Sequence, residues 1–172
     1  MARIRPARTC RNVNSQAWAR YSQKKPRKNY VKALPHTSLI VFKMGVSKES
    51  YDTSVTLNAE VPIQLRSNSL ESARQIINRH LEANIPANYL FRILVYPHIV
   101  IREHKMASGA GADRISQGMS NSFGKPVSIA ARIYKNQPLF LVKTTKQNRP
   151  VAVAALKRAA YKLSGKYRVR AD

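Results

Sequence analysis

Acidic residues are scarce in this chain: eight Asp and Glu stand against 31 Lys and Arg among 172 residues. The formal net charge of +23 opposes compaction through self-repulsion unless a polyanion neutralises it. Nucleic acid is the commonest such partner, and an anionic membrane surface is the rival. The shortage of carboxylates also argues against an active site built on paired acidic residues.

Cysteine and long apolar runs are nearly absent as well. Cys10 is the single cysteine, which excludes an internal disulfide and any zinc site that needs a cysteine pair. No apolar run approaches the roughly 20 residues that span a bilayer, and the N-terminus lacks the apolar stretch of a secretory signal. We therefore expect a cytoplasmic protein with no place in a membrane.

Catalytic motifs are missing too. Residues 108–113 (SGAGAD) are only superficially similar to a dinucleotide-binding loop, because the third glycine is absent at the required spacing. No nucleophile lies beside a positioned base. The histidines lack metal-ligand spacing: His36, His80, His98 and His104. We expect no enzyme, cofactor, metal or small-molecule substrate, although an RNA-modifying enzyme stays open on charge alone.

The basic residues that are present gather near the two ends of the chain. Residues 1–36 contain no acidic residue and few apolar ones, so they cannot offset an ordering cost of ~1–2 kcal/mol per residue. We predict an extended basic segment over 1–36, ordered only against a polyanion, and one domain over 37–172. Trp18, Tyr21 and Tyr30 would suit exposed bases there; a solvated tail without a specific partner is the alternative.

Several β-rich runs are predicted in the domain. They cover residues 38–44, 53–61, 127–134 and 139–144, the last two joined as a hairpin by residues 135–138. Val55, Leu57, Ala59 and Val61 alternate as in a half-buried strand. Residues 89–95 and 98–103 resemble one long strand with a bulge or an edge at Pro97.

Two long helices are predicted beside these strands. Residues 68–84 begin with a capping-box pattern at Asn68 and Glu71, and residues 150–163 begin with Pro150. The expected inner stripes are Leu70, Ala73, Ile77 and Leu81 in the first helix, and Val153, Leu156, Ala160 and Leu163 in the second. With a weak helix over 113–123, the pattern predicts an α+β fold: an antiparallel or mixed sheet with two long helices packed on one face.

A loop of small residues is the most distinctive local feature. It consists of Lys105, Met106, Ala107, Ser108, Gly109, Ala110, Gly111 and Ala112. Fixing eight residues with so little to bury costs on the order of 8–16 kcal/mol, so the loop should be mobile in the free protein. Small residues also allow close backbone approach. The loop therefore suits a probe inserted into crowded RNA, with a plain surface connection as the alternative.

Residues 97–126 carry a family signature. Its parts are Arg102, residues 105–106 (KM), 111–114 (GADR), 118–119 (GM) and 123–126 (FGKP), with further matches at 5–8, 68–79, 131–132 and 155–160. This pattern resembles the large-subunit ribosomal protein family called L-ten-e in archaea and eukaryotes and L-sixteen in bacteria, in its archaeal-type branch. The chain departs from the family at Lys43, where Asp is common, and at Ser120, where a basic residue is common.

The resemblance implies an α/β hammerhead-like fold and a place in the large ribosomal subunit near the elbow of the A-site tRNA. The loop at 105–112 would reach toward the P-site tRNA and the peptidyl-transferase centre and help to position tRNA while RNA performs the chemistry. The implied partners are large-subunit rRNA, A-site and P-site tRNA, and neighbouring large-subunit ribosomal proteins.

Candidate rRNA contacts are basic residues, because an Arg guanidinium bonds phosphate bidentately and such contacts position a protein without reading sequence. In the N-terminal segment they are Arg3, Arg5, Arg8, Arg11, Arg20, Lys24, Arg27 and Lys32, and around the loop they are Arg102, Arg114 and Lys125. Two alternatives are a sequence-independent DNA-binding protein, which lacks a known motif, and a membrane-surface protein that uses the helix at 150–163.

Overall fold

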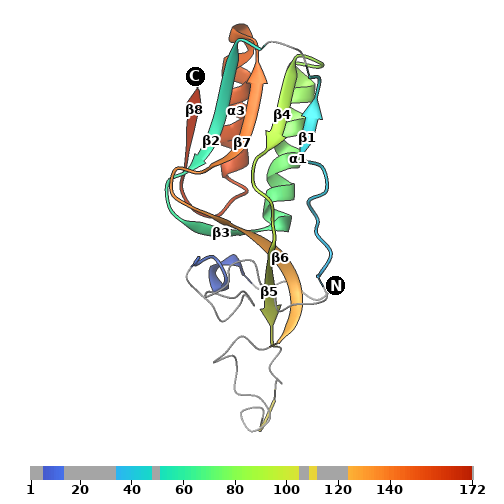
Figure 1. The fold of residues 1–172 in the computed structure, drawn as a ribbon, viewed down its shortest axis with the longest axis vertical. Helices are drawn as coiled ribbons and strands as arrows, with labels where there is room; N and C mark the ends of the chain where they lie inside the picture. The colour runs from blue at the N-terminus through green and yellow to red at the C-terminus, as the bar shows by residue number, and fades with distance from the viewer. Residues whose placement is uncertain (1–5, 14–33, 48–50, 105–108, 112–123, 172) are drawn as a thin grey trace.

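The computed structural model describes residues 6–13, 34–47, 51–104, 109–111 and 124–171, which form an α+β structure (Figure 1). The strands are β1 (Lys43–Gly45), β2 (Thr53–Ala59), β3 (Ile63–Arg66), β4 (Tyr89–Ile93), β5 (Ile99–Glu103), β6 (Lys125–Ile133), β7 (Pro138–Thr144) and β8 (Tyr167–Ala171). The helices are α1 (Ser67–Asn84) and α3 (Arg149–Ala160), with 3-10 turns η1 (Ala7–Thr9) and η2 (Lys146–Asn148).

The strands form two sheets. A five-stranded sheet has the order β1-β4-β7-β2-β8, and a three-stranded sheet has the order β3-β6-β5. Every pairing between the described strands is antiparallel. Of the two predicted possibilities, an antiparallel or a mixed sheet, the structure therefore shows the antiparallel one. Both helices cover the same face of the five-stranded sheet and pack against each other (Figure 1), so the prediction of two helices on one face is confirmed.

The main core lies between the helices and the five-stranded sheet. The predicted α1 stripe is confirmed, because Leu70, Ala73, Ile77 and Leu81 are all fully buried. The α3 stripe was predicted only in part: the buried residues are Ala152, Ala155, Leu156 and Ala159, while Val153 and Ala160 are only partly buried. Apart from Arg149, Lys157 and Arg158, every residue of this helix is apolar, so its sequence pattern does not fix which face turns inward.

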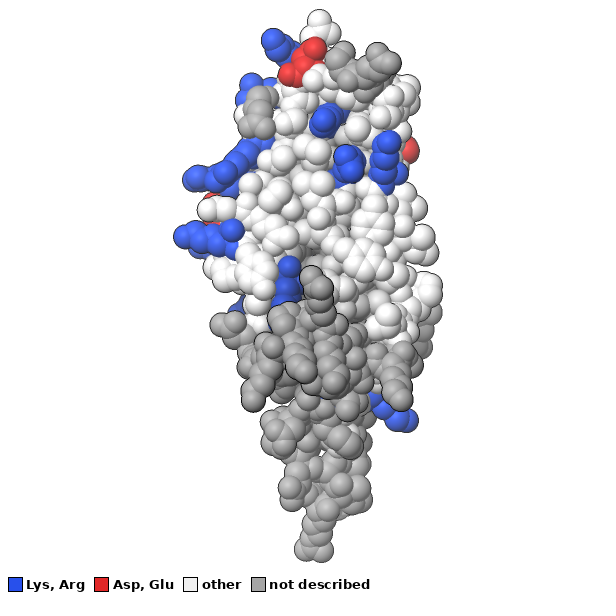
Figure 2. Space-filling view, in the orientation of Figure 1, with Lys and Arg blue, Asp and Glu red and all other residues white. Residues whose placement is uncertain are grey.

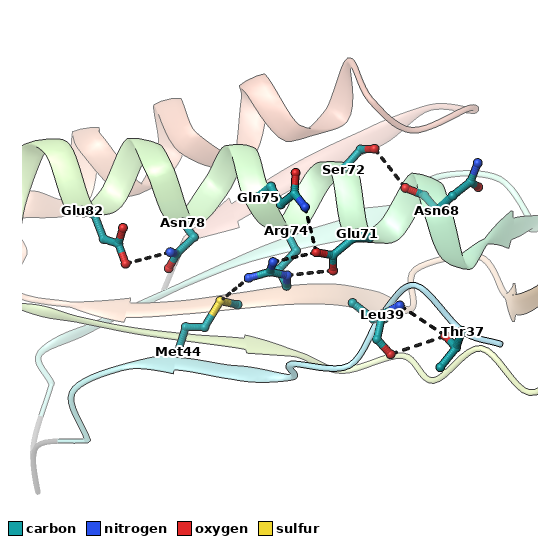
Figure 3. Close-up of polar contacts among 10 residues, drawn as sticks. All are labelled: Thr37, Leu39, Met44, Asn68, Glu71, Ser72, Arg74, Gln75, Asn78 and Glu82. Carbon is teal, nitrogen blue, oxygen red and sulfur yellow. Dashed lines mark hydrogen bonds and ion pairs between the residues drawn. The ribbon is translucent and has the colours of Figure 1, made fainter. Parts of the chain in front are cut away.

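The predicted capping box at the start of α1 is wrong. The residue before the helix is Arg66, and no side chain caps the first turn. Glu71 instead accepts hydrogen bonds from Arg74, with Nη2 to Oε1 at 2.6 Å and Nε to Oε2 at 2.8 Å, and from Gln75 (Figure 3). This bidentate pair, which is charge-assisted, outweighs a bond from Glu71 back to the helix start.

Two predicted strand connections are also wrong. Residues 89–103 do not form one long strand, because β4 lies in the five-stranded sheet and β5 in the three-stranded sheet. β6 and β7 likewise lie in different sheets, so they form no hairpin. Both edges of β7 are occupied, by β2 and β4, and β6 pairs instead with β3 and β5.

The strand ends differ in smaller ways from the prediction. The strand at 53–61 is confirmed as far as Ala59, while Val61 is exposed beyond it. The first strand covers Lys43–Gly45 rather than 38–44. Strands β3 and β8 were not predicted, and the weak helix predicted at 113–123 lies outside the described residues.

Candidate nucleic-acid interface

The start of the chain is anchored on the three-stranded sheet. The side-chain Nε2 of Gln64 in β3 donates to the carbonyl of Cys10 at 2.8 Å, and the backbone N–H of Gln64 donates to the carbonyl of Arg11 at 2.8 Å. Cys10 is buried against Ile101 and Ala130, and burial raises the pKa of its thiol while the nearby charge of Arg66 lowers it less.

This anchoring corrects one prediction. Residues 6–13 contain the η1 turn and pack on the protein itself, so this part of the segment is not extended as predicted. The reason is Gln64, which provides two donors to a backbone that would otherwise leave buried carbonyls unpaired. The predicted dependence of the segment on a polyanion stays a prediction. The side chains of Arg8 and Arg11 remain exposed, and their backbone is held in place. Arg3, Arg5, Arg20, Lys24, Arg27 and Lys32 lie outside the described residues.

The ribbon formed by β5 and β6 leads toward the small-residue loop. At Gly124 the backbone comes so close to Glu103 that a Cβ on Gly124 would lie 2.7 Å from the carbonyl carbon of Glu103. Gly124 also has a φ of +116°, which favours glycine. Arg102 is 4% exposed and lies opposite Pro126 at a register shift. Among the predicted contacts that the structure describes, it is the one whose side chain is buried. Lys125 is exposed beside Glu103.

Three residues of the loop are described. Gly109, Ala110 and Gly111 are exposed, and they lie at the end of the molecule opposite the five-stranded sheet (Figure 1). Gly109 and Gly111 have φ values of +131° and +80°, and a Cβ on either would meet nothing within 4 Å. A side chain at either position would therefore meet open space. Lys105, Met106, Ala107, Ser108, Ala112 and Arg114 lie outside the described residues.

A third basic surface was missed by the sequence reasoning. We call it the outer sheet face: the side of the five-stranded sheet that the helices leave uncovered. Its basic residues are Lys43, Arg92, Lys143, Arg168 and Arg170. In Figure 2 this face is toward the viewer and blue side chains are spread over it. The alternation of residues 167–171 (YRVRA), with basic residues at every second position, was the available signal.

Other kinds of site find little support in the part of the chain that the structure describes. No group of three or more His, Cys, Asp or Glu there could hold a metal ion. No helix among the same residues has the length and apolar character needed to cross a membrane. His80 is partly buried, and its pKa is lowered by burial and by the charge of Arg158.

Comparison with known proteins identifies the family. Residues 18–170 match the family described as ribosomal protein L16p/L10e. The chain is similar to the large ribosomal subunit protein uL16 of Methanococcus aeolicus, with 40% identity over 96% of this chain and 92% of that protein. It is 39% identical to the protein of that name from Archaeoglobus fulgidus, over 87% of this chain and 86% of that protein.

A third relative, the large ribosomal subunit protein uL16 of Methanocella arvoryzae, is 42% identical over 83% of this chain and 84% of that protein. The family is one of ribosomal proteins and not of enzymes. The predicted resemblance is thus confirmed over nearly the whole chain, and the closely matching relatives are archaeal. The chain belongs to the ribosomal protein L16p/L10e family.

Proposed function

We propose that this chain is a structural constituent of the large ribosomal subunit, where it binds large-subunit rRNA and contacts neighbouring ribosomal proteins. The observation that carries the proposal is the family match over residues 18–170. The relatives that the chain matches along most of their length are named as large ribosomal subunit proteins. The net charge of +23 supports it independently, because an rRNA partner would neutralise the self-repulsion. This role favours rRNA over DNA and over a membrane surface.

Identification of the bound RNA tests this proposal. The chain would carry an affinity tag at its C-terminus, and the RNA that co-purifies from cells would be sequenced after a high-salt wash. Large-subunit rRNA should dominate the purified RNA. Recovery of mostly DNA, of mostly messenger RNA, or of no nucleic acid would overturn the proposal.

A finer role is proposed for two parts of the chain, the basic N-terminal segment and the small-residue loop. The segment at 1–36 would bind rRNA through its basic residues, and the domain at 37–172, with its hammerhead-like shape, would place the loop at 105–112 near the A-site and P-site tRNAs and the peptidyl-transferase centre. The exposed, glycine-bearing tip of the loop supports this role, since small residues allow a backbone to approach RNA closely.

Deletion of residues 107–111 tests the finer role. The shortened protein should fold and enter the large subunit, because the described residues of this stretch, Gly109, Ala110 and Gly111, are exposed. Translation or the final maturation of the subunit should nevertheless be impaired. Circular dichroism of the purified variant and its distribution in ribosome profiles are the measurements. Loss of the folded domain, or fully normal translation, would contradict it.

A further inference from the structure

The outer sheet face carries cations in register across strands that are distant in sequence. Lys43 in β1 lies opposite Arg92 in β4, and Arg92 lies opposite Leu141 in β7. Leu141 in turn lies opposite Thr56 in β2, and Thr56 opposite Arg170 in β8. One row across the sheet therefore has basic residues toward both edges and uncharged residues between them.

Strand spacing sets the scale of this row. Neighbouring strands lie about 4.8 Å apart, so Arg92 and Arg170, three strands apart, are separated by roughly 14 Å at the backbone. Lys143, in the next row, lies opposite Ser54 and Leu90. The face is thus broad and basic toward both edges, and its middle carries the uncharged Leu141 and Thr56 together with one cation, Lys143 of the central strand β7.

Acidic residues do not balance these cations. None of the described residues in the five strands of this sheet is acidic. Glu60, just beyond β2, lies 3.6 Å from Arg168, but the two side chains are 42% and 70% exposed, so the ion pair is weak in water. The helices occupy the other face, so the charge of this face is directed away from the protein core (Figure 2).

A polar cavity lies at the β2–β8 edge of the same face. It has a volume of about 190 Å³ and is lined in part by Asn58, Glu60, Lys135, Arg168 and Arg170. Asn58 is 8% exposed, and its Nδ2 donates to the carbonyl of Asn136 at 3.2 Å. Only the amide nitrogen can donate to a carbonyl, which fixes the orientation of the side chain.

The other end of that amide lacks a partner. The Oδ1 of Asn58 is buried and accepts no hydrogen bond from the described residues. A buried acceptor without a donor is costly, and Asn58 lines a cavity that is open to a ligand. The matching ligand group is a hydroxyl donor next to an anion that the three surrounding cations would bind.

We propose that the outer sheet face docks on the backbone of a double-stranded rRNA segment, with the phosphates held by Lys43, Arg92 and Arg170 and a ribose 2′-hydroxyl donating to Oδ1 of Asn58. The proposal rests on the proposed function and adds the surface and the sugar group that it uses. Double-stranded RNA has a wide, shallow minor groove that presents 2′-hydroxyls between phosphate backbones. A broad face with cations toward both edges complements that groove in shape and in charge.

Matched charge variants test the surface. The triple variant Lys43→Gln, Arg92→Gln and Arg170→Gln removes three cations from the outer sheet face. The control Lys157→Gln, Arg158→Gln and Lys162→Gln removes three exposed cations on or just after α3, on the other side of the sheet. Binding of the full chain to purified large-subunit rRNA, with tRNA as competitor, would be measured at several salt concentrations.

The salt dependence distinguishes the possible outcomes. Each lost phosphate contact reduces the magnitude of the slope of log affinity against log salt concentration by about 0.7–0.9. The sheet variant lacks three such contacts, so the magnitude of its slope should be smaller by about 2–3. The control should keep the wild-type slope. Equal losses in the two variants would overturn the docking surface and leave the proposed function intact. Failure of the wild type to bind rRNA above the competitor would overturn both.

A modified sugar tests the role of Asn58. The wild-type chain should bind a short RNA duplex about 2- to 12-fold more tightly than the same duplex with 2′-O-methyl riboses, the ratio that one hydrogen bond supports. Asn58→Ala should abolish this preference, with its fold checked by thermal unfolding. If the wild-type chain bound both duplexes equally well, the sugar contact would be overturned. It would also be overturned if the Asn58→Ala variant kept the wild-type preference.

Discussion

Replacing Gln64 by Leu should release the start of the chain from the three-stranded sheet. The side chain of Gln64 is 3% exposed and donates to the carbonyl of Cys10 at 2.8 Å. Leu has a similar volume but no donor, so the Cys10 carbonyl would lose this partner in a buried place. Such a loss costs about 1–3 kcal/mol, which raises the population of the open segment about 5- to 150-fold.

The thiol of Cys10 reports this opening directly. Cys10 is the single cysteine of the chain, and it is buried with a raised pKa, so a thiol reagent modifies it only when the segment opens. The measurement is the rate of modification of the folded protein by a chromogenic disulfide at a fixed pH. The rate in Gln64→Leu should exceed the wild-type rate by the same 5- to 150-fold factor.

A matched control separates this effect from a general loss of stability. Gln75→Leu makes the same chemical change on the exposed side of α1, where Gln75 donates to Glu71. It should leave the rate for Cys10 within about twofold of wild type. The reasoning would be refuted if Gln64→Leu reacted no faster than Gln75→Leu.

Three further changes test the fold. Gly124→Ala should cost at least about 1–3 kcal/mol, because the new Cβ would meet the Glu103 backbone at 2.7 Å with φ at +116°. Leu156→Ala, at a fully buried site, should cost about 2–5 kcal/mol; urea unfolding measures both. Glu71→Gln should lower stability at neutral pH. The Arg74 hydrogen bond holds the pKa of Glu71 below its usual value, so the charged carboxylate stabilises the fold above the unfolded-state pKa. The difference in stability between Glu71→Gln and wild type should vanish as pH falls through the folded-state pKa of Glu71.

Each of these has a clear contrary result. An unchanged urea midpoint for Gly124→Ala would mean that the two strands of the ribbon can separate without cost. A loss below about 1 kcal/mol for Leu156→Ala would mean that the interface between α3 and the sheet is loosely packed. A stability difference for Glu71→Gln that grows in acid would reverse the sign derived from the ion pair.

The parts of the fold that sequence predicts well are those with a strong local period. The α1 stripe of Leu70, Ala73, Ile77 and Leu81 and the alternation of Val55 and Leu57 each have polar residues between the apolar ones, so only one face can be buried. In α3 the neighbours of Leu156 are mostly apolar as well, and the buried face was set by packing against α1 and the sheet.

The parts that sequence does not predict depend on distant partners. The strand at 138–144 follows 125–133 closely in the chain, but its two edges are taken by strands from other regions, and no local signal records that choice. The docking of Cys10 depends on Gln64, which is 54 residues away. The outer sheet face collects its cations from four strands with a non-sequential order, so it becomes visible only when the sheet is assembled.

The central claim, that this chain is a component of the large ribosomal subunit, is tested most directly by sedimentation of cell lysate through a sucrose gradient at low and high salt, with the protein followed by mass spectrometry. Because the chain combines a broad basic surface with a folded core, it should migrate with the large subunit and with whole ribosomes and should resist the high-salt wash. A protein that stays at the top of the gradient, or that moderate salt removes from the large subunit as purely electrostatic contacts would allow, would contradict the account.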